Sequence, residues 1–286
     1  MPAEYGQDRC QKPYSWVCYS HFSTQLSEFA QLFSIFTFTG NVDMAEMMFY
    51  ERVVSLGDKL HAGLKVRPAV NFAYAARANS VPVLASEFFE CAREYPIVFG
   101  RGESGPLPVV LLGLRDGENL FVDAHGKWDA RYVPAFVRRY PFVPVNSSKG
   151  DLLVCIDEAS ECFSTEEGEA LFADGKPTPQ LEHAIKFLRE FHQAALATEQ
   201  LGRRIAELGL LRQADPAAQL SDGSQIRLNG LDVIDEAKLR ELNRDAVQEL
   251  FASGGLGVIY AHLLSLGHLA GLVDRLGRRK PKRKKR

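Results

Sequence analysis

The feature that most constrains the fold is a long uncharged run near the C-terminus. Residues 250–273 contain no Asp, Glu, Lys or Arg, and the chain then ends in the basic sequence RRKPKRKKR. A membrane anchor with a positively charged flank has this pattern. A buried helix followed by a solvated tail has it too.

The composition of this run favours the buried helix. Five glycines, two histidines and two serines interrupt it, and only LGVIYAHLLSL, residues 256–266, is densely apolar. A membrane-spanning helix needs about twenty predominantly apolar residues, whereas a helix of this stretch would be roughly 16 Å long, half of a bilayer. We therefore expect a C-terminal core helix over about 256–266 that ends at Gly267, and no transmembrane span.

The charge of the chain is divided unevenly. The net charge is −2, but Arg278–Arg286 contribute +8, which leaves −10 for residues 1–277. An acidic body repels phosphate backbones, so nucleic-acid binding would depend on the tail alone and would be nonspecific. We expect residues 275–286 to be a basic, disordered tail, with at most a weak contact to anionic surfaces through Arg278–Arg286.

The cysteines and the N-terminal residues indicate a reduced, cytoplasmic protein. The five cysteines form no CxxC pair and no Cys/His spacing typical of zinc, so we expect no metal site and no cofactor. The N-terminal sequence MPAEYGQDRCQKPYSW has neither the basic region nor the apolar core of a cleaved signal peptide. We expect cytoplasmic localisation. The alternative is association with the cell surface by a route without an N-terminal signal peptide.

Two Asp-Gly dipeptides predict β-hairpins. Apolar runs at 108–114 and 119–123 flank Asp116-Gly117, and Asp222-Gly223 lies in a similar setting. The dipeptide readily supplies the positive φ angle that a tight hairpin turn needs. With a further apolar run at 151–156, these patterns predict a mostly antiparallel sheet.

A long helix completes the predicted α+β fold. Apolar residues recur at helical spacing over about 179–208, and Gly209 is a natural end for the helix. This helix and the C-terminal helix would cover one or both faces of the sheet.

Several short segments carry a resemblance to a known family. In chain order they are FYERVVSL, HAGLKVRP, NSVPVLASEF, YPIVF, LLGLRDGENLFVDAHGKWDARYVPAFVRRYPF, CIDEAS, VIDEAKLREL and GLGVIYAHLLSL. They resemble the bacterial SapC family named for a surface-layer (S-layer) locus, which is distinct from the peptide-transport permease of the same name. The likeness runs from about Phe49 to Leu266 and is closest over 111–142.

The resemblance implies a domain organisation and a setting. Residues 1–46 would be an N-terminal extension, poorly packed or upstream of the native start, and 47–274 would be the SapC-like α+β domain. The family is associated with S-layer formation and serum resistance in one lineage. Elsewhere its members neighbour outer-membrane receptors, cupin-like oxygenases and tryptophan-halogenase-like flavoproteins. It brings no agreed catalytic residues, so the catalytic residues stay unknown.

Chemistry alone suggests a few candidates for ligand binding. His61, Asp123 and His125 are of the types that bind non-haem iron, although DAH at 123–125 lacks the HxD spacing and is more typical of a solvated turn. Arg138 and Arg139 are suited to grip a carboxylate or phosphate. They are equally suited to the solvated last turn of a helix, whose carbonyl groups favour cations.

Asp157 and Glu158 follow the predicted strand 151–156. Paired acids at a strand end serve acid–base catalysis or cap the next turn, and we favour capping.

We expect a non-catalytic or accessory binding protein of a bacterial surface-layer or peptide/glycan-modification system, whose partner is another protein of that system. Its candidate ligand-binding residues are His61, Asp123, Arg138, Arg139, Asp157 and Glu158. The alternative is an enzyme that acts with, or like, a metal-dependent oxygenase on a carboxylate-bearing substrate. That enzyme would use the same residues except Arg139.

Overall fold

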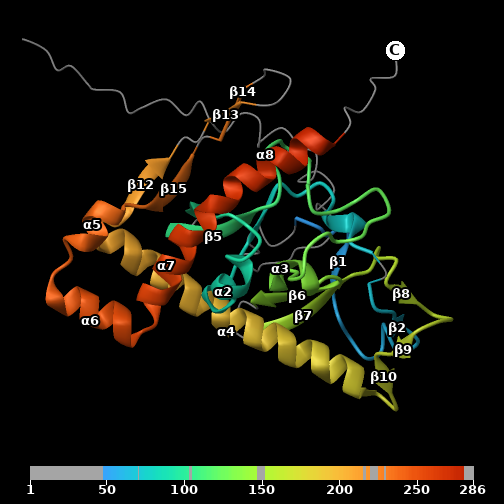
Figure 1. Cartoon of the computed structure of the whole chain (residues 1–286). Coiled ribbons are helices and arrows are strands. Elements are labelled where there is room, and N and C mark those ends of the chain that lie inside the picture. Colours follow the sequence, from blue (N-terminus) through green and yellow to red (C-terminus); the bar gives the residue numbers. More distant parts are fainter. Residues whose placement is uncertain are drawn as a thin grey trace, which may run out of the picture. The chain divides into compact units, whose positions relative to one another are not determined.

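A five-stranded antiparallel sheet is the largest sheet of the computed structural model (Figure 1). The structure describes residues 48–69, 71–102, 105–146, 152–214, 217–219, 225–228 and 230–279, all of which belong to the unit 41–286. The strand order is β12 (Leu211–Ala214), β15 (Leu231–Ile234), β4 (Ile97–Gly102), β5 (Gly105–Leu111) and β3 (Ser80–Pro82). The N-terminal half of β4 is almost fully buried, so this sheet lies at the centre of the core.

Smaller antiparallel sheets account for the other described strands. One joins β1 (Val53–Ser55), β7 (Leu152–Asp157) and β6 (Phe142–Asn146), and another joins β8 (Phe163–Ser164), β2 (Lys65–Val66) and β9 (Glu169–Ala170). Two pairs remain: β10 (Phe172–Ala173) with β11 (Lys176–Pro177), and β13 (Ala217–Gln219) with β14 (Gln225–Arg227). The predicted strand at 151–156 is β7, and the predicted α+β class with antiparallel sheets is confirmed.

The described helices vary widely in length. The short ones are the 3₁₀ turns η2 (Ala73–Ala75), η3 (Ala85–Glu87) and η4 (Leu266–His268) and the helices α2 (Phe88–Cys91), α3 (Ala135–Arg138) and α5 (Glu236–Arg240). The longer ones are α4 (Pro179–Glu207), α6 (Arg244–Ala252), α7 (Gly255–Ser265) and α8 (Leu269–Arg278).

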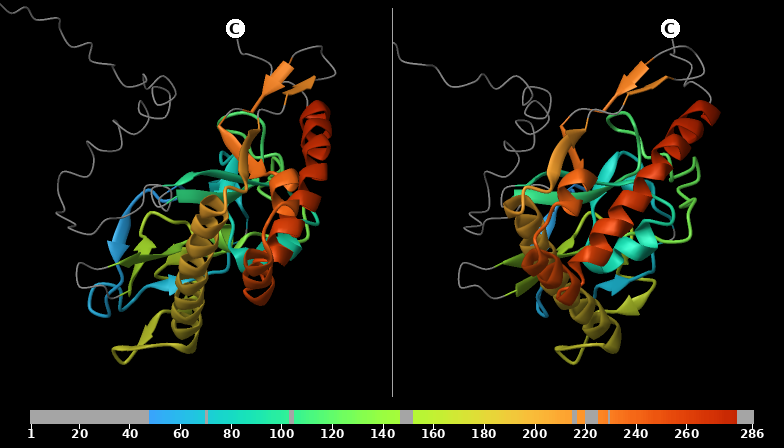
Figure 2. Two further views of the ribbon diagram at one scale, coloured as in Figure 1. Left: turned by 90° about the vertical axis from the view of Figure 1, so that its left-hand side faces the viewer. Right: turned by 60° about the vertical axis from the view of Figure 1, so that its left-hand side comes forward.

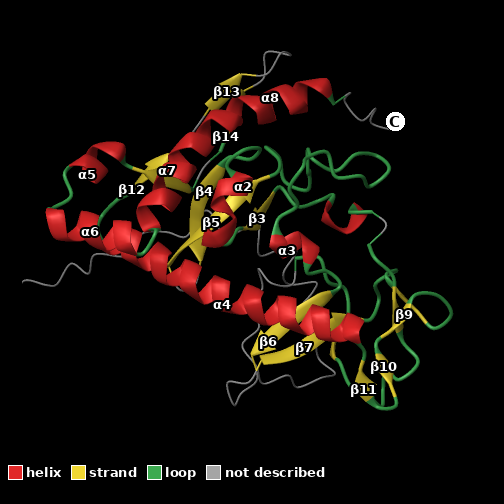
Figure 3. Cartoon of the chain, turned by 60° about the horizontal axis from the view of Figure 1, so that its bottom comes forward, coloured by secondary structure: helices red, strands yellow, loops and turns green. Residues whose placement is uncertain are grey.

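The predicted long helix is confirmed as α4. Thr178 caps it, because its Oγ1 accepts a hydrogen bond from the Leu181 amide at 3.4 Å. Pro179 suits the first turn, where its missing N–H group would have no helical partner. The helix ends before Gly209, whose φ of +65° is the left-handed conformation that glycine tolerates. Figure 3 shows α4 running past β4 and β5 and also past β6 and β7.

Helix α4 approaches the large sheet closely at Gly202. A Cβ atom built at this residue would lie 2.5 Å from the carbonyl oxygen of Pro106 in β5. The obstacle is backbone rather than the flexible end of a side chain, so the glycine sets the distance between helix and sheet.

The two strands of the hairpin predicted around Asp222-Gly223 are present. β13 and β14 pair antiparallel from Ala217 opposite Arg227 to Gln219 opposite Gln225. The dipeptide itself lies outside the described residues.

The prediction of a hairpin around Asp116-Gly117 is wrong, because the two expected strands do not pair with each other. The dipeptide forms a turn, with Gly117 at φ +69°, but residues 119–123 do not pair with β5 as a strand. β5 pairs with β4 on one side and β3 on the other. The buried Asn119 holds the following segment as a loop, because its side chain donates to the Ala75 carbonyl (3.0 Å) and accepts from the Phe121 amide (2.8 Å).

The C-terminal helix extends beyond its predicted end. α7 continues through η4 into α8, and Gly267 does not stop it. Leu272 and Leu276 continue the apolar spacing and are buried, which favours the longer helix. In Figure 2, α4 and α8 lie on opposite sides of β12 and β15.

The end of α8 is anchored. Residues 275–279, which the sequence analysis placed in the tail, are the last turn of α8 and its C-cap. Arg275 forms an ion pair with Asp129 at 2.7 Å, and Arg279 donates to the Asn119 and Val122 carbonyls at 2.6 Å. Residues 280–286, like the predicted extension 1–46, lie outside the described residues.

By length and composition, Gly255–Arg278 could cross a membrane, although a buried core helix has the same properties. α7 is bonded to the ends of two strands. Ser265 Oγ accepts from the amide of Ile97, the first residue of β4 (2.9 Å). His262 Nε2 accepts from the amide of Ile234, the last residue of β15 (3.1 Å). These buried bonds favour the expected core helix.

We predict that Gly202→Ala destabilises the protein by about 1–3 kcal/mol, because the new methyl group would force α4 away from β5. Gly271→Ala is the matched control, since this exposed glycine in α8 has nothing within 4 Å of the added atom. Alanine is the better helix former, so the control should be neutral or stabilising by up to about 1 kcal/mol. Denaturant unfolding of both variants measures the difference. Equal stability of the two variants would contradict the close approach.

Candidate functional site

Two of the candidate residues stabilise local turns. His61 is buried, and its Nδ1 lies 3.1 Å from both the amide nitrogen and the carbonyl oxygen of Gly57. Asp123 is exposed, and its Oδ1 accepts hydrogen bonds from the amides of Lys127 (2.9 Å) and His125 (2.8 Å). These bonds, led by that from Lys127, lower the pKa of the Asp123 carboxyl. Each side chain thus closes the turn in which it lies.

Arg138 belongs to a polar network at the corner between α2 and α3. Its Nη2 is 3.3 Å from the Tyr132 hydroxyl and 3.8 Å from the carboxylate of the buried Glu87. That carboxylate accepts from the Tyr132 hydroxyl (2.6 Å) and from the Ala135 amide (2.7 Å). Burial raises the pKa of Tyr132, and the hydrogen bond to Glu87 is the second largest cause of this increase. The Arg138 guanidinium also lies over the Phe187 ring of α4, so the network links three helices.

Arg139 lies among aromatic rings, apart from the network of Arg138. It is buried, and its guanidinium carbon lies 4.1 Å from the Phe136 ring centre, 5.0 Å from that of Phe191 and 5.9 Å from that of Tyr50. Cations over aromatic faces are attracted by the ring quadrupole, more strongly where water is excluded. Arg139 therefore packs between α3 and α4 and is not a solvated helix end.

Asp157 ties the start of β1 to the end of β7. Its buried carboxylate accepts from the amides of Arg52 (2.9 Å) and Glu51 (3.1 Å) and from the Tyr140 hydroxyl (3.3 Å). Burial raises the pKa of Tyr140 to about 12. Glu158 is exposed and forms an ion pair with Arg52 at 3.2 Å.

The structure brings two of the six candidates, Arg139 and Asp157, close to the same pair of tyrosines. Tyr50 lies beside the Arg139 guanidinium, and its ring centre is 5.5 Å from that of Tyr140, which bonds Asp157. The remaining candidates make separate local contacts. Among the described residues there is no group of three or more His, Cys, Asp or Glu side chains that could hold a metal ion.

An open pocket of about 370 Å³ lies where η4 and α8 meet the large sheet. Val98, Leu231 and Val233 form its floor, and Leu266 and Leu269 form one wall. The strand register explains why Arg212 lies beside the residues of the floor. Because Arg212 pairs with Val233, the two side chains stand on the same face of the sheet.

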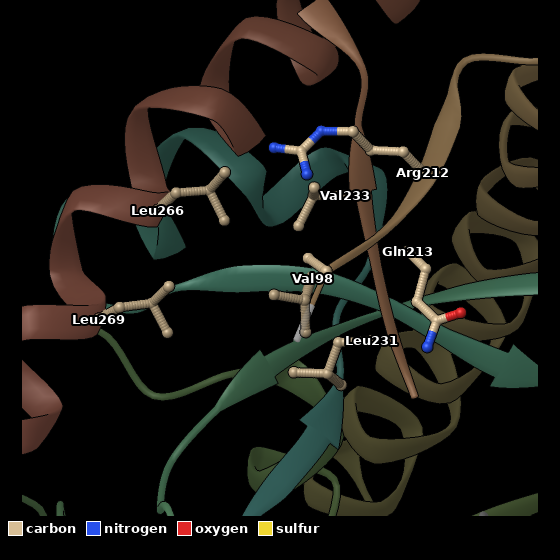
Figure 4. Close-up of a pocket in the computed structure, with 8 residues that line it drawn as sticks. Val98, Arg212, Gln213, Leu231, Val233, Leu266 and Leu269 are labelled. Atoms are coloured by element: carbon tan, nitrogen blue, oxygen red, sulfur yellow. The ribbon is translucent and has the colours of Figure 1, made fainter. Parts of the chain in front are cut away.

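Arg212 is the charged group of this pocket. Figure 4 shows its guanidinium extending over the pocket toward Leu266, while Gln213 points away from it. Arg212 is exposed and forms no ion pair with any described residue. The pocket therefore offers an apolar surface with the Arg212 guanidinium at its rim, an arrangement suited to an apolar ligand with an anionic end.

Comparison with known proteins identifies the family. The SapC family's sequence model matches residues 56–272. The chain belongs to the SapC family. All six candidate residues and every residue that lines the pocket fall within this SapC range, whereas the last turns of α8 lie beyond it. No curated protein and no solved structure matches the chain.

The pocket of this SapC protein was not predicted from the sequence. Arg212 stands in LLRQA, where it reads as an ordinary solvated strand residue. The alternation of Leu231 and Val233 with their neighbours was the available signal, since alternate residues share one face of a strand. Nothing in the sequence places that face beside Leu266 and Leu269, which follow it by more than thirty residues.

His262 also has a role that the sequence analysis did not find. Its ring is fully buried, 5.1 Å from the Phe99 ring, and Nε2 accepts the Ile234 amide. A neutral imidazole that accepts at Nε2 carries its proton on Nδ1. Burial disfavours the charged form and lowers the pKa of His262 from 6.5 to about 4.

We predict that acid destabilises this protein partly through His262. Between pH 6.5 and 4 the unfolded chain binds a proton that the folded ring refuses, so the free energy of unfolding falls as the pH is lowered. The shift corresponds to about 3 kcal/mol at the acid end. In His262→Gln the amide oxygen can still accept the Ile234 bond without titrating. Denaturant unfolding of both proteins from pH 7 to pH 4 isolates the effect, and a constant difference between them would contradict it.

Proposed function

We propose that this SapC protein is a non-catalytic, accessory binding protein of a bacterial surface-layer or peptide/glycan-modification system. Its partner is another protein of that system, and the two meet in the cytoplasm or, alternatively, at the cell surface. The observation that carries the proposal is the Arg212 guanidinium, which lies over an apolar pocket without an ion-pair partner among the described residues. The family's association with S-layer formation supports the setting.

The side chains that line the pocket indicate which chemical groups of the partner would bind there. Its floor and wall are aliphatic side chains from β4, β15, η4 and α8, which favour an aliphatic segment by removing apolar surface from water. A guanidinium presents two parallel N–H groups to a carboxylate and binds it more strongly than a neutral acceptor. An apolar segment with a terminal carboxylate, such as the C-terminus of a polypeptide, fits both features.

The enzyme alternative receives less support from the geometry. Its five residues would have to converge on one substrate, but Asp157 is engaged with backbone amides, Arg138 with the Glu87 network and His61 with Gly57. Groups that act together in catalysis must lie within hydrogen-bond reach of one substrate position.

A labelled peptide tests the binding proposal. The probe is a fluorescein-labelled Gly-Leu-Val-Leu-Val, prepared with a free C-terminal carboxylate and as the C-terminal amide. We expect the full-length protein to bind the carboxylate form more tightly in fluorescence anisotropy. Arg212→Gln should weaken that binding by roughly tenfold and abolish the preference, because it removes a charge-assisted hydrogen bond.

Two further variants define the site. Ala214→Phe should block both peptides by filling the pocket, which Ala214 lines beside Leu231. Arg189→Gln removes an exposed arginine from α4 and should change nothing. Equal affinity for the two peptide forms would refute the role of Arg212. Tighter binding of decanoate than of the peptide would replace the protein partner with a free organic acid.

Metal analysis of the purified full-length protein tests the enzyme alternative. We expect no stoichiometric iron or zinc, because His61 and Asp123 are engaged in separate turns. Stoichiometric metal that is lost in His61→Ala or His125→Ala would favour the enzyme instead. His192→Ala, on α4, serves as the control for a histidine outside the candidate set.

A further inference from the structure

The α7–α8 helix carries an exposed apolar strip on a different side from the pocket. Tyr260 is 54% exposed and Leu264 is 74% exposed, although both lie on a helix whose other residues are mostly buried. Leu264 and the pocket residue Leu266 are two positions apart, so they point to nearly opposite sides of the helix. The strip is therefore a second surface, independent of the proposed ligand pocket.

Phe89 of α2 widens this strip. It is 62% exposed, and its ring lies 3.1 Å from the position that a Cβ atom of Gly257 would occupy. Gly257 precedes Tyr260 by three residues and so lies on the same side of α7. Beyond Leu264 the same side continues with the exposed residues Gly267 and Gly271. We call Phe89, Gly257, Tyr260, Leu264, Gly267 and Gly271 the outer strip.

The outer strip ends in positive charge. Arg278 is exposed one turn beyond Asp274, which is the only acidic residue from 255 to 286. Arg279, the last described residue, is held by the carbonyls of Asn119 and Val122. The residues that follow are KPKRKKR, with six further cations. From Tyr260 to Arg278 the helix is about 27 Å long, apolar first and cationic last.

We propose that the outer strip, together with the exposed Arg278, docks on an anionic lipid bilayer with the helix lying in the plane of the interface. The six cations that follow in the sequence add to the attraction. Exposed aromatic and aliphatic side chains enter the boundary between headgroups and acyl chains, and nearby lysines and arginines are attracted to anionic lipids. Residues 1–277 carry a net charge of −10, so the charge complementarity is confined to this end.

The same helix does not need to cross the bilayer. Its other side is packed in the protein core through Ile259, Leu272 and Leu276 and is bonded to strand ends by His262 and Ser265. Insertion across a membrane would break these buried contacts. Docking through the outer strip leaves all of them intact.

Vesicle binding by the full-length protein tests the proposal. We expect co-sedimentation with vesicles of phosphatidylglycerol and phosphatidylcholine, and much less with phosphatidylcholine alone. Tyr260→Trp supplies a reporter, whose emission should shift to the blue when anionic vesicles are added. Leu60→Trp is the matched control, because Leu60 is 84% exposed in a turn outside the strip and should show no shift.

Two alterations separate the apolar and the electrostatic parts. The double variant Tyr260→Ser, Leu264→Ser should lower the vesicle affinity by roughly tenfold or more through lost apolar contact, with an unchanged melting temperature because both side chains are exposed. Leu60→Ser should bind like the parent protein. Removal of residues 280–286 should abolish the preference for anionic vesicles.

Three results would overturn the proposal. One is the absence of binding to either vesicle type. Another is binding that the double serine variant retains in full and that salt removes, which would leave the tail alone in contact with lipid. A third is a blue shift of Tyr260→Trp without vesicles, accompanied by dimerisation, which would assign the outer strip to a second copy of the chain.

Discussion

The packing of α4 against two different sheets holds the described part of this SapC protein together. Leu181 and Leu188 pack with β6 and β7, Phe191 enters the main core, and Ile205 packs with Phe99 of β4. The helix therefore reaches all three apolar clusters. Its close approach to β5 at Gly202 limits the spacing between helix and sheet.

Buried polar groups fix the remaining geometry by joining segments that are distant in sequence. Thr198 of α4 accepts a hydrogen bond from the Ala85 amide at the start of η3, Glu87 joins the end of η3 to α3, and Asp157 joins β7 to the residues before β1. Each carboxylate is satisfied by several donors, as burial of a charge requires. The acids that seemed suitable for chemistry in the sequence thus serve mainly to position the backbone.

The α7–α8 helix has three environments along its circumference. One side is buried against the core, a second contributes Leu266 and Leu269 to the pocket under Arg212, and a third exposes Tyr260 and Leu264. Such a helix satisfies the apolar spacing of a core element and still leaves apolar side chains exposed. Its composition resembles a membrane span for this reason, although its buried bonds to β4 and β15 place it within the fold.

The sequence by itself determined the features that depend on neighbouring residues: α4 with its end at Gly209, the strands β13 and β14, the α+β class and membership of the SapC family. Only the tertiary structure decided the partner of β5, the continuation of the last helix past Gly267, the burial of His262 and the pocket. The pocket joins Val98 to Arg212 and Leu266, each of which follows Val98 by more than a hundred positions along the chain. Local preferences cannot specify such contacts, because their free energy comes from apolar burial and hydrogen bonding that exist only once the distant segments have met.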